Sequence, residues 1–452
     1  MLRPRQLVVQ VAVGLTLVIL TIIALRTPSS HRLLHADTSE QTSEPQQPQL
    51  QPPRPKYKPE PSFTPPPIAD PFPALATSAP PPIPAYNVPE KDAWRKYGLD
   101  IAPPLLIGFT RSYPMLLQTV VSYITAGWPP EHIYVVENTG AQQANSRGRL
   151  TLQHPLFLNH AALHTLGVNI VQTPVLLSFA QLQNFYLSLS YTHQWPYYFW
   201  SHMDVLALGH EDGLENHSPR AGEPGYKSLY TLCIEELNRT LATDTRWATR
   251  FFAYDWLTLT NPRAVEDVNG WDTMIPYYMT DCDFYSRLDM RNWTQRDGNC
   301  GVITDTSSTL EDLRALYRDP NVVPRLNDPN PPPPQTAPEE KKDKRHVMAR
   351  QDESPPPNLS DPVEYWKALK AVADSMFHYK HGDRGRNTWQ AGQHGGMDEP
   401  FYYNNAGFTE ALEILTEAGK EVYRRKWGHQ DCQLIGGGGL KFDDQWRVEK
   451  DW

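Results

Sequence analysis

The 452-residue sequence contains few cysteines and no excess of basic charge. No two of its four cysteines form a Cys-x-x-Cys pair, which argues against a structural zinc site. In an oxidising compartment the four could form one or two disulfides, whose pairing the sequence leaves open. The formal net charge of −9 argues against the basic face of a nucleic-acid-binding protein, so we expect no nucleic-acid partner.

Charge is also missing from one long stretch near the N-terminus. Residues 7–25 carry no charged side chain, and a helix with a rise of about 1.5 Å per residue over them spans a bilayer core of about 30 Å. A cleaved signal peptide is the alternative, but its apolar region is shorter and ends at a small-residue cleavage site. We therefore expect a transmembrane signal anchor, with residues 1–6 as a cytosolic tail. The rest of this single-pass type II protein would lie in the lumen of the Golgi or ER.

Two segments are too polar and too rich in proline to form a core. Residues 26–98 are expected to form an extended, disordered stem. Residues 326–358 are a second low-complexity stretch, interpreted as a disordered insertion because periodic sequence resumes after it. The folded domain is then expected over residues 99–452, in the lumen. Four glycosylation sequons support that location: Asn216, Asn238, Asn292 and Asn358.

Strand-like and helix-like segments alternate in the first half of this domain. Short apolar runs predict strands at 104–109, 132–138, 168–173 and 197–201, and helical periodicity falls at 113–127, 155–166 and 178–194. This order predicts an α/β fold with a mostly parallel sheet and helices on both faces. Ligands of such sheets bind outside the carboxyl ends of the strands. The polar residues that follow the predicted strands are Thr110, Arg111, Glu137, His202 and Asp204.

The stretch YYFWSHMDVLAL, residues 197–208, interrupts an apolar run with His202 and Asp204. A turn-forming Asp beside a partly buried His would explain it, because turns favour Asp. A metal site would explain it too, since a carboxylate can hold the Mn²⁺ or Mg²⁺ ion that neutralises a nucleotide diphosphate. The added imidazole favours Mn²⁺ over Mg²⁺.

A second polar stretch is NGWDTMIPYYMTDCDFYSRL, residues 269–288. Gly270 and Trp271 are typical of a loop, and Asp281 and Asp283 begin a helix, whose positive end favours carboxylates. An acidic helix start is one explanation. The other is catalysis, since a carboxylate close to a reacting hydroxyl can accept its proton.

Together these stretches resemble the inverting, family 2-like GT-A glycosyltransferases. That family has an acid after its second strand, matched here by Glu137, and an Asp-x-Asp motif after a later strand, matched by Asp204 with His202 in place of the first Asp. It also has a G-[FW]-D…Y-x-E-D-x-D…R-L segment, which residues 270–288 match with Thr280 in place of the Glu. The proline-rich segments are similar to those of filamentous-fungal proteins.

The resemblance implies a Rossmann-like GT-A domain that transfers a sugar from a nucleotide-sugar donor to a glycan, glycoprotein or glycolipid acceptor. By it, Asp281 is the catalytic base and Asp204 holds Mn²⁺ (or Mg²⁺), with His202 as a second ligand or facing the ribose. Asp283 and Trp271 would help to seat the acceptor sugar. The residues that would contact the nucleoside are Thr110, Arg111 and Glu137.

An amphipathic helix is expected over residues 363–381, followed by a loop rich in glycine and aromatic residues. Many GT-A enzymes close over the donor with such a segment, and some add a late His as a metal ligand. His394 is the candidate here, with His381 as second choice, although a lone His is more often structural.

Two other functions stay open on the sequence alone. His202 and Thr280 would suit a non-catalytic, membrane-tethered binding protein on a degenerate GT-A scaffold. A hydrolase that uses Asp281 and Asp283 as its acid and base is disfavoured, because two carboxylates two residues apart at a helix start point in different directions.

Overall fold

The computed structural model describes residues 54–59, 67–327, 358–382, 395–401 and 404–452. The chain divides into two units, 1–64 and 65–452, and residues 54–59 of the first form no helix or strand. The expected membrane span at 7–25 lies outside the described residues, as does most of the expected insertion. Within the described ranges, no helix has both the length and the apolarity to cross a bilayer.

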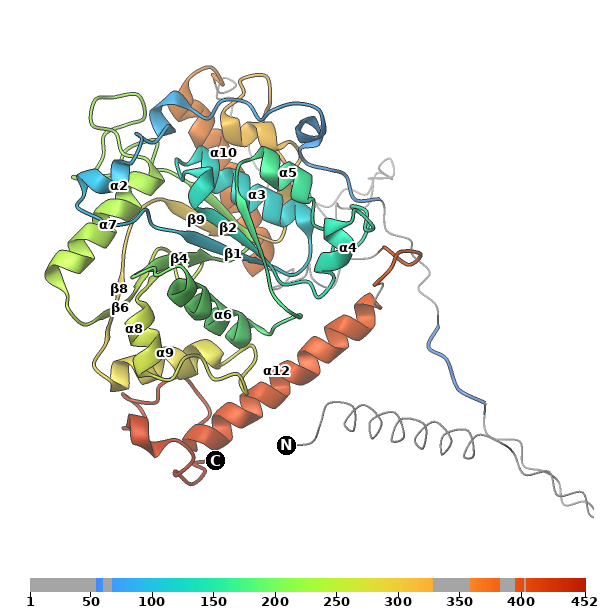
Figure 1. Cartoon of the computed structure of the whole chain (residues 1–452), viewed down its shortest axis with the longest axis vertical. Coiled ribbons are helices and arrows are strands. Elements are labelled where there is room, and N and C mark those ends of the chain that lie inside the picture. Colours follow the sequence, from blue (N-terminus) through green and yellow to red (C-terminus); the bar gives the residue numbers. More distant parts are fainter. Residues whose placement is uncertain (1–53, 60–66, 328–357, 383–394, 402–403) are drawn as a thin grey trace, which may run out of the picture. The chain divides into compact units, whose positions relative to one another are not determined.

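A seven-stranded sheet forms the centre of the second unit (Figure 1). Its strand order is β3-β2-β1-β4-β7-β6-β8, and among these seven only β7 runs against its neighbours. The predicted mostly parallel α/β sheet is therefore confirmed, and β1 to β4 fall inside their predicted ranges. The strands are β1 (Leu105–Phe109), β2 (Ile133–Glu137), β3 (Asn169–Gln172), β4 (Tyr198–Ser201), β6 (Trp247–Phe251), β7 (Leu257–Thr260) and β8 (Thr294–Asp297).

Alternate side chains of β1 separate the two faces of the sheet. Leu105 and Ile107 lie in a large core with residues of α3, α5 and α7, whereas Leu106 packs with residues of α6. The helices α3 and α6 lie on opposite faces of the sheet (Figure 1). Gly108 permits this packing, because a Cβ there would lie 2.5 Å from the Tyr186 hydroxyl oxygen of α6. The flanking helices are α3 (Tyr113–Thr125), α4 (Gln142–Ser146), α5 (His160–Thr165), α6 (Phe179–Thr192), α7 (Leu229–Thr243), α8 (Pro262–Asp267) and α9 (Thr280–Met290), with the 3-10 turn η3 (Pro130–His132) before β2.

Two short antiparallel pairs follow the main sheet. β5 (Val205–Leu208) pairs with β9 (Val302–Asp305) in a register that places Val205 opposite Asp305. The second pair is β10 (Thr309–Leu310) with β11 (Leu326–Asn327), and η4 (Leu313–Tyr317) lies between its strands in sequence. The helix predicted at 363–381 is confirmed as α10 (Pro362–His381), which contacts β9. The Trp366 indole of α10 donates a hydrogen bond of 2.8 Å to the Gly209 carbonyl oxygen just after β5.

Residues 67–98 differ from the expected disordered stem. The side chains of Phe72 and Trp94 are buried in the large core. Asn87 is also buried, and its amide donates to the Thr125 carbonyl oxygen at 2.8 Å and to Glu211 at 3.2 Å. Proline content alone missed these anchors, because the contacts come from the residues between the prolines. The segment contains η1 (Pro73–Ala76), η2 (Ala85–Asn87) and α2 (Ala93–Lys96).

The C-terminal part of the chain is attached to α9. The helix α12 (Asn405–Trp427) contacts α9, and a disulfide joins Cys282 of α9 to Cys432. The short turn η5 (Phe442–Asp444) follows. The disulfide supplies the pairing that the sequence left open, while Cys233 and Cys300 are free and buried.

Candidate active site

The strand order changes direction between β1 and β4. From β1 the chain moves outward through β2 to β3, and β4 then pairs on the other side of β1. In open α/β sheets, ligands bind outside the carboxyl ends of the strands at such a switch point. Thr110 and Arg111 follow β1, and His202 and Asp204 follow β4, so the structure brings these predicted residues to one edge of the sheet.

The loop that carries His202 and Asp204 is held from three sides. The Thr119 hydroxyl of α3 donates to the Met203 carbonyl oxygen at 2.7 Å and lies 2.8 Å from that of Val205. The His202 backbone N–H donates to the Trp256 carbonyl oxygen at 3.1 Å. The Thr306 backbone N–H donates to the Asp204 carbonyl oxygen at 2.8 Å. These bonds fix the Asp204 carboxylate at the start of β5.

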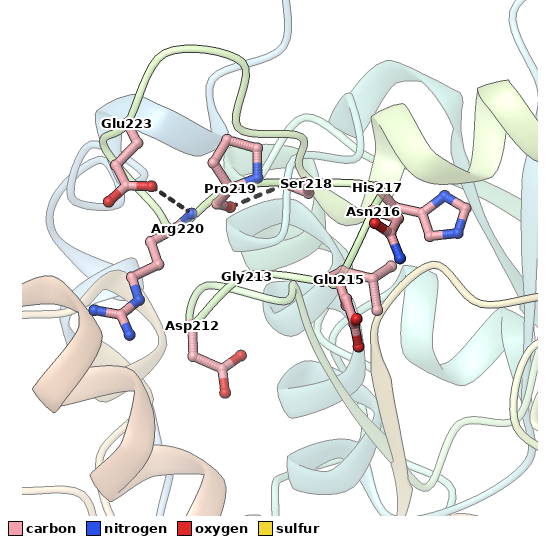
Figure 2. Close-up of a pocket in the computed structure, with 10 residues that line it drawn as sticks. Asp212, Gly213, Glu215, Asn216, His217, Ser218, Pro219, Arg220 and Glu223 are labelled. Atoms are coloured by element: carbon pink, nitrogen blue, oxygen red, sulfur yellow. Dashed lines mark hydrogen bonds between the residues drawn. The ribbon is translucent and has the colours of Figure 1, made fainter.

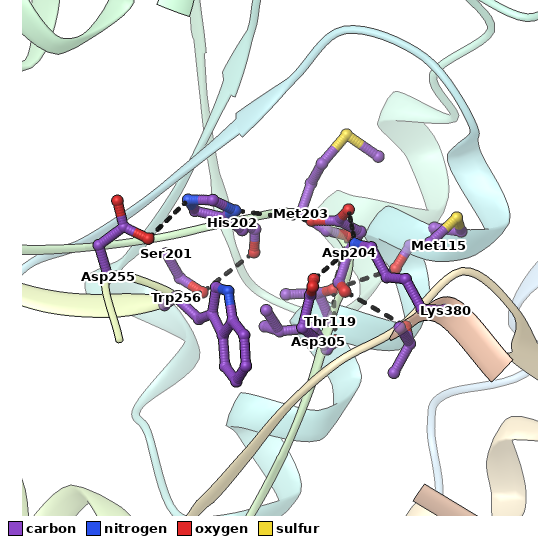
Figure 3. A network of polar contacts seen from close by, with 12 residues as sticks. Met115, Thr119, Ser201, His202, Met203, Asp204, Asp255, Trp256, Asp305 and Lys380 are labelled. Atoms are coloured by element: carbon purple, nitrogen blue, oxygen red, sulfur yellow. Dashed lines mark hydrogen bonds and ion pairs between the residues drawn. The ribbon is translucent and has the colours of Figure 1, made fainter. Parts of the chain in front are cut away.

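The Asp204 carboxylate is paired with a lysine that the sequence had not singled out (Figure 3). Lys380 of α10 places its Nζ 2.6 Å from Asp204 Oδ2 and 2.5 Å from Asp305 Oδ1. Burial alone would raise the pKa of Asp204, but the charges of Lys380 and His202 outweigh it and hold that pKa below its usual range. The same two carboxylates raise the pKa of Lys380 despite its burial. This lysine is therefore charged and only 3% exposed.

His202 stands between Asp204 and a second buried acid, Asp255 (Figure 3). Its Nδ1 lies 3.8 Å from Asp204 Oδ1, and its Nε2 lies 3.7 Å from Asp255 Oδ1. Among the described residues, neither His202 Nε2 nor Asp255 Oδ1 has a hydrogen-bond partner. Burial raises the pKa of Asp255, and the nearby Asp281 carboxylate raises it further, against the opposing charge of His202. We name His202, Asp204, Asp255, Asp281, Asp305 and Lys380 the carboxyl-edge cluster.

The backbone around this cluster adopts conformations that L side chains rarely take. Ala253 and Tyr254, in the turn between β6 and β7, have φ values of 68° and 50°, and Met279 before α9 has φ 71°. Each costs free energy of the order of 1–3 kcal/mol for a non-glycine residue, and such residues cluster at functional sites. The β6–β7 turn brings Asp255 to the carboxyl end of β6, which has the same direction as β4.

The two acids at the start of α9 face different surroundings, as predicted. Asp281 is partly exposed, and its Oδ2 accepts a hydrogen bond of 3.1 Å from the Tyr254 hydroxyl. Asp283 is fully buried, and its carboxylate lies 2.7 Å from both Arg287 and Lys426. An acid–base pair of Asp281 and Asp283 is therefore excluded, and so is contact between Asp283 and an acceptor sugar.

Trp271 also has a structural role in place of the expected acceptor contact. Its side chain is 4% exposed and stacks on Phe284 with ring centroids 4.0 Å apart. The loop signal at Gly270-Trp271 was correct, because Gly270 has φ 70° and the Trp271 backbone N–H donates to Asn184 at 2.8 Å. The indole nevertheless packs in a small hydrophobic core with Phe284 and Leu288 of α9.

Glu137 lies at the end of β2, as predicted, but its carboxylate is saturated by protein groups. Asn145 donates to Oε1 at 2.7 Å, Gln172 donates to Oε2 at 2.9 Å, and His160 lies 2.9 Å from Oε2. Burial would raise the pKa of Glu137, but these partners lower it overall. With no exposed surface, Glu137 does not make the ligand contact that was predicted for it.

Thr110 and Arg111 lie at the end of β1, where a donor contact was predicted. Thr110 is half-buried. The Arg111 side chain is buried, with its guanidinium carbon 4.0 Å from the ring centroid of Phe408 of α12. The start of α12 therefore covers Arg111 in this structure.

The expected metal does not fit the residues as they are arranged. Asp204 Oδ2 is taken by Lys380, and within the described ranges no group of three or more His, Cys, Asp or Glu side chains could hold a metal ion. His394 lies outside the described residues. His381, the second choice, has its Nε2 2.8 Å from Asp305 Oδ2.

Sequence reasoning missed Asp255, Asp305 and Lys380. Asp255 and Asp305 had a usable signal, because each follows a short run of β-branched or aromatic residues, as Asp204 does. Lys380 had a different signal: it continues the apolar face of a predicted amphipathic helix, where a charged residue is unexpected.

A separate surface depression is formed by the loop after β5 (Figure 2). It encloses about 630 Å³, and residues 212–220 and Glu223 line it. None of these residues belongs to the carboxyl-edge cluster. Asn216 of the first sequon lies in this lining.

The sequence matches no protein-family model and no curated protein sequence. Among solved structures, a cytidylyltransferase from Leptospira borgpetersenii is similar over 48% of this chain and 86% of its own, with 11% identity and a TM-score of 0.28. A mannosyltransferase from Pyrobaculum calidifontis, in complex with GDP-Man and Mn²⁺, is similar over 46% of this chain and 60% of its own, with 11% identity and a TM-score of 0.27. Likeness at this level carries no argument about chemistry, which rests on the geometry above.

Proposed function

We propose that this protein is a glycosyltransferase that moves a sugar from a nucleotide-sugar donor to an acceptor hydroxyl, with inversion. The observation that carries the proposal is the position of Asp281. It is a partly exposed carboxylate in the first turn of α9, bonded to Tyr254 and electrostatically coupled to buried Asp255 at the carboxyl edge of the sheet. That edge is where a Rossmann-like sheet with this strand order binds its ligand.

The proposed reaction is a single displacement. The Asp281 carboxylate accepts the proton of the acceptor hydroxyl, whose oxygen forms a bond to the anomeric carbon of the donor sugar. The bond between that carbon and the diphosphate breaks, and the nucleoside diphosphate leaves with the electron pair. Thr110 is the proposed donor contact, whereas Arg111 is buried under Phe408 and is not proposed as one. No step is routed through a metal ion.

The secretory location is part of the proposal. A disulfide between Cys282 and Cys432 requires an oxidising compartment such as the ER or Golgi lumen. The side chains of all four sequon asparagines are exposed, as glycosylation requires: Asn216, Asn238, Asn292 and Asn358. The membrane anchor at residues 7–25 and the type II orientation stay predictions from the sequence.

A non-catalytic binding protein on the same scaffold is the second candidate. It is favoured by the pairing of Asp204 and Asp305 with Lys380 and by the saturation of Glu137, which leave few free acids at the edge. Turnover separates the two candidates, because both predict nucleotide binding.

The test is the Asp281→Asn variant of the full-length protein in a screen of UDP- and GDP-sugars. We expect the wild type to hydrolyse one donor slowly. We expect the variant to lose roughly 10²–10⁴-fold in sugar transfer, the range for removal of a general base, while its donor affinity is unchanged. Asp289→Asn, on the exposed side of the same helix, is the matched control and should retain activity. An active Asp281→Asn enzyme would disprove the assignment.

A further inference from the structure

A lysine occupies the core-facing side of α10. The buried residues of this helix recur at three- and four-residue spacing, which defines one face of an α-helix. Every other member of this face is apolar or aromatic: Tyr365, Trp366, Leu369, Ala373 and Met376 precede Lys380. A charged side chain at such a position is rare unless it is paired. The helix α10 therefore positions the Lys380 ammonium in the protein interior.

The ammonium lies between two carboxylates from different strands. Asp204 immediately precedes β5 and Asp305 ends β9, and the pairing of Val205 with Asp305 sets the two acids side by side. Lys380 Nζ lies 2.6 Å from one and 2.5 Å from the other (Figure 3). His381 Nε2 lies 2.8 Å from the remaining Asp305 oxygen. Two carboxylates and an imidazole are a common ligand set for Mn²⁺ or Zn²⁺. Here they surround an ammonium.

An ammonium and a divalent ion cannot share this position. A metal ion bound directly by Asp204 Oδ2 and Asp305 Oδ1 would lie about 2.0–2.2 Å from both oxygens, inside the volume that the Lys380 Nζ fills. Displacing Lys380 would leave a buried cation without its partners, which is strongly unfavourable. The folded structure therefore disfavours metal binding at Asp204 and Asp305, because Lys380 already occupies the position of the ion.

We propose that the ammonium of Lys380 takes the place of a divalent metal ion at Asp204, so that this protein binds its nucleotide diphosphate without a metal. The claim that a nucleotide diphosphate binds without a metal rests on the proposed function. The claim that Lys380 takes the place of the ion concerns Asp204, Asp305 and Lys380 alone. The exposed parts of the site, His202 at 29% and His381 at 20%, then face the ligand, and Lys380 neutralises the carboxylates behind them.

The first measurement is Mn²⁺ binding to the full-length protein, followed by electron paramagnetic resonance. We expect the wild type to bind no Mn²⁺ at this site. Lys380→Ala should gain one Mn²⁺ site, because Asp204, Asp305 and His381 can then close on a cation. Lys426→Ala is the matched control, because Lys426 also bridges two aspartates, half-buried Asp272 and buried Asp283. Asp283 there keeps Arg287, and no His of the described residues pairs with either acid. It should gain no site.

Three outcomes would overturn the inference. One is stoichiometric Mn²⁺ binding by the wild type that Asp204→Asn removes. Another is a folded Lys380→Ala variant that binds no Mn²⁺. The third is affinity of the wild type for UDP or GDP that is about tenfold or more higher with Mn²⁺ than with EDTA, a difference of about 1.4 kcal/mol. If Lys380→Ala does not fold, the two wild-type measurements still decide the question.

The proposed function fails in a distinguishable way. If neither UDP nor GDP binds in Mn²⁺ or in EDTA, the nucleotide-dependent enzyme is disproved. The Mn²⁺ measurements on the wild type and on Lys380→Ala still decide whether Lys380 stands in for a metal.

Discussion

Two buried lysines in this protein make nearly the same contacts in different surroundings. Lys380, in the last turn of α10, bridges Asp204 and Asp305. Lys426, in the last turn of α12, lies 2.7 Å from both Asp272 and Asp283. Each lysine is almost fully buried, and each ties together segments that are distant in sequence.

The difference lies in what else surrounds the acids. Around Lys426, the Trp427 indole donates to Asp283 at 2.9 Å and Arg287 pairs with it, so this acid is completely enclosed. Around Lys380, two histidines are partly exposed, His202 beside Asp204 and His381 beside Asp305. In the same cluster, Asp255 Oδ1 has no hydrogen-bond partner among the described residues. The comparison teaches that a buried lysine–aspartate bridge does not by itself mark a functional site. Partly exposed titratable side chains beside the bridge are the distinguishing observation.

Of the two lysine bridges, the Lys426 bridge is expected to contribute to stability alone, so its removal should destabilise the fold. We expect Lys426→Met to destabilise the fold by about 3–5 kcal/mol, because it leaves Asp272 and buried Asp283 short of a positive partner. Thermal unfolding measures this. Lys420→Met, which removes a more exposed lysine of the same helix, should change stability by less than about 0.5 kcal/mol. Equal stability of the two variants would show that the Lys426 bridge is unimportant.

Removing the disulfide tests the same region by a covalent route. The double variant Cys282→Ser, Cys432→Ser should lose about 2–5 kcal/mol of stability, because the bond closes a loop across a separation of 150 residues. UDP affinity should not change, since neither sulfur belongs to the carboxyl-edge cluster. Wild-type protein under reducing conditions should unfold at the same temperature as the double variant. A difference between them would mean that the substitutions act by another route.

Asp255→Asn, in the carboxyl-edge cluster, should stabilise the protein, in contrast to Lys426→Met. Because burial raises the pKa of Asp255, the unfolded chain loses this proton at lower pH than the folded protein does. The charge therefore destabilises the fold increasingly as pH rises above the unfolded value of about 3.9, and asparagine removes the effect. We expect a gain of about 1–3 kcal/mol at neutral pH, and none at a pH below that value.

A gain for Asp255→Asn that is the same at all pH values would contradict this account. The melting temperature, measured across the pH range, provides the test. A stabilised variant with reduced sugar transfer would identify Asp255 as a residue that lowers stability at a functional site.

The smallest expected effect is that of Tyr254→Phe. The hydroxyl donates to Asp281 and the side chain is 58% exposed, so stability should hardly change. Loss of one hydrogen bond of about 0.5–1.5 kcal/mol to the proposed base should lower the rate of sugar transfer roughly 2- to 10-fold. Steady-state kinetics on the identified donor measures it, and an unchanged rate would remove Tyr254 from the site.

The sheet could be predicted because its determinants are local. Apolar runs with β-branched residues mark β1 to β4, and the helical period of α3, α6 and α10 is visible in their buried faces. The strand order fixes which polar residues share an edge, so Thr110, Arg111, His202 and Asp204 were placed correctly. The Asp281 helix start was also visible, because acids at a first turn follow the helix dipole.

The pairing of side chains could not be predicted, because it depends on contacts distant in sequence. Asp204 and Lys380 are 176 residues apart, and Asp283 and Trp427 are 144 apart. Without those partners, Asp204 resembles an open metal ligand and Asp283 resembles an acceptor contact. Trp271 was misassigned for the same reason, since the Phe284 ring that covers it follows in the next helix.

The burial of residues 67–98 sets where a working fragment of this protein can begin. A fragment that starts at residue 99 would lack Phe72 and Trp94 from the core, and Glu211 would lose the Tyr86 hydroxyl and the Asn87 amide that bind it. Such a fragment should aggregate on expression, whereas one that includes residue 67 keeps these contacts. Residues 67–98 have the composition of a dispensable spacer, but a truncated protein for crystallisation or secretion should retain them.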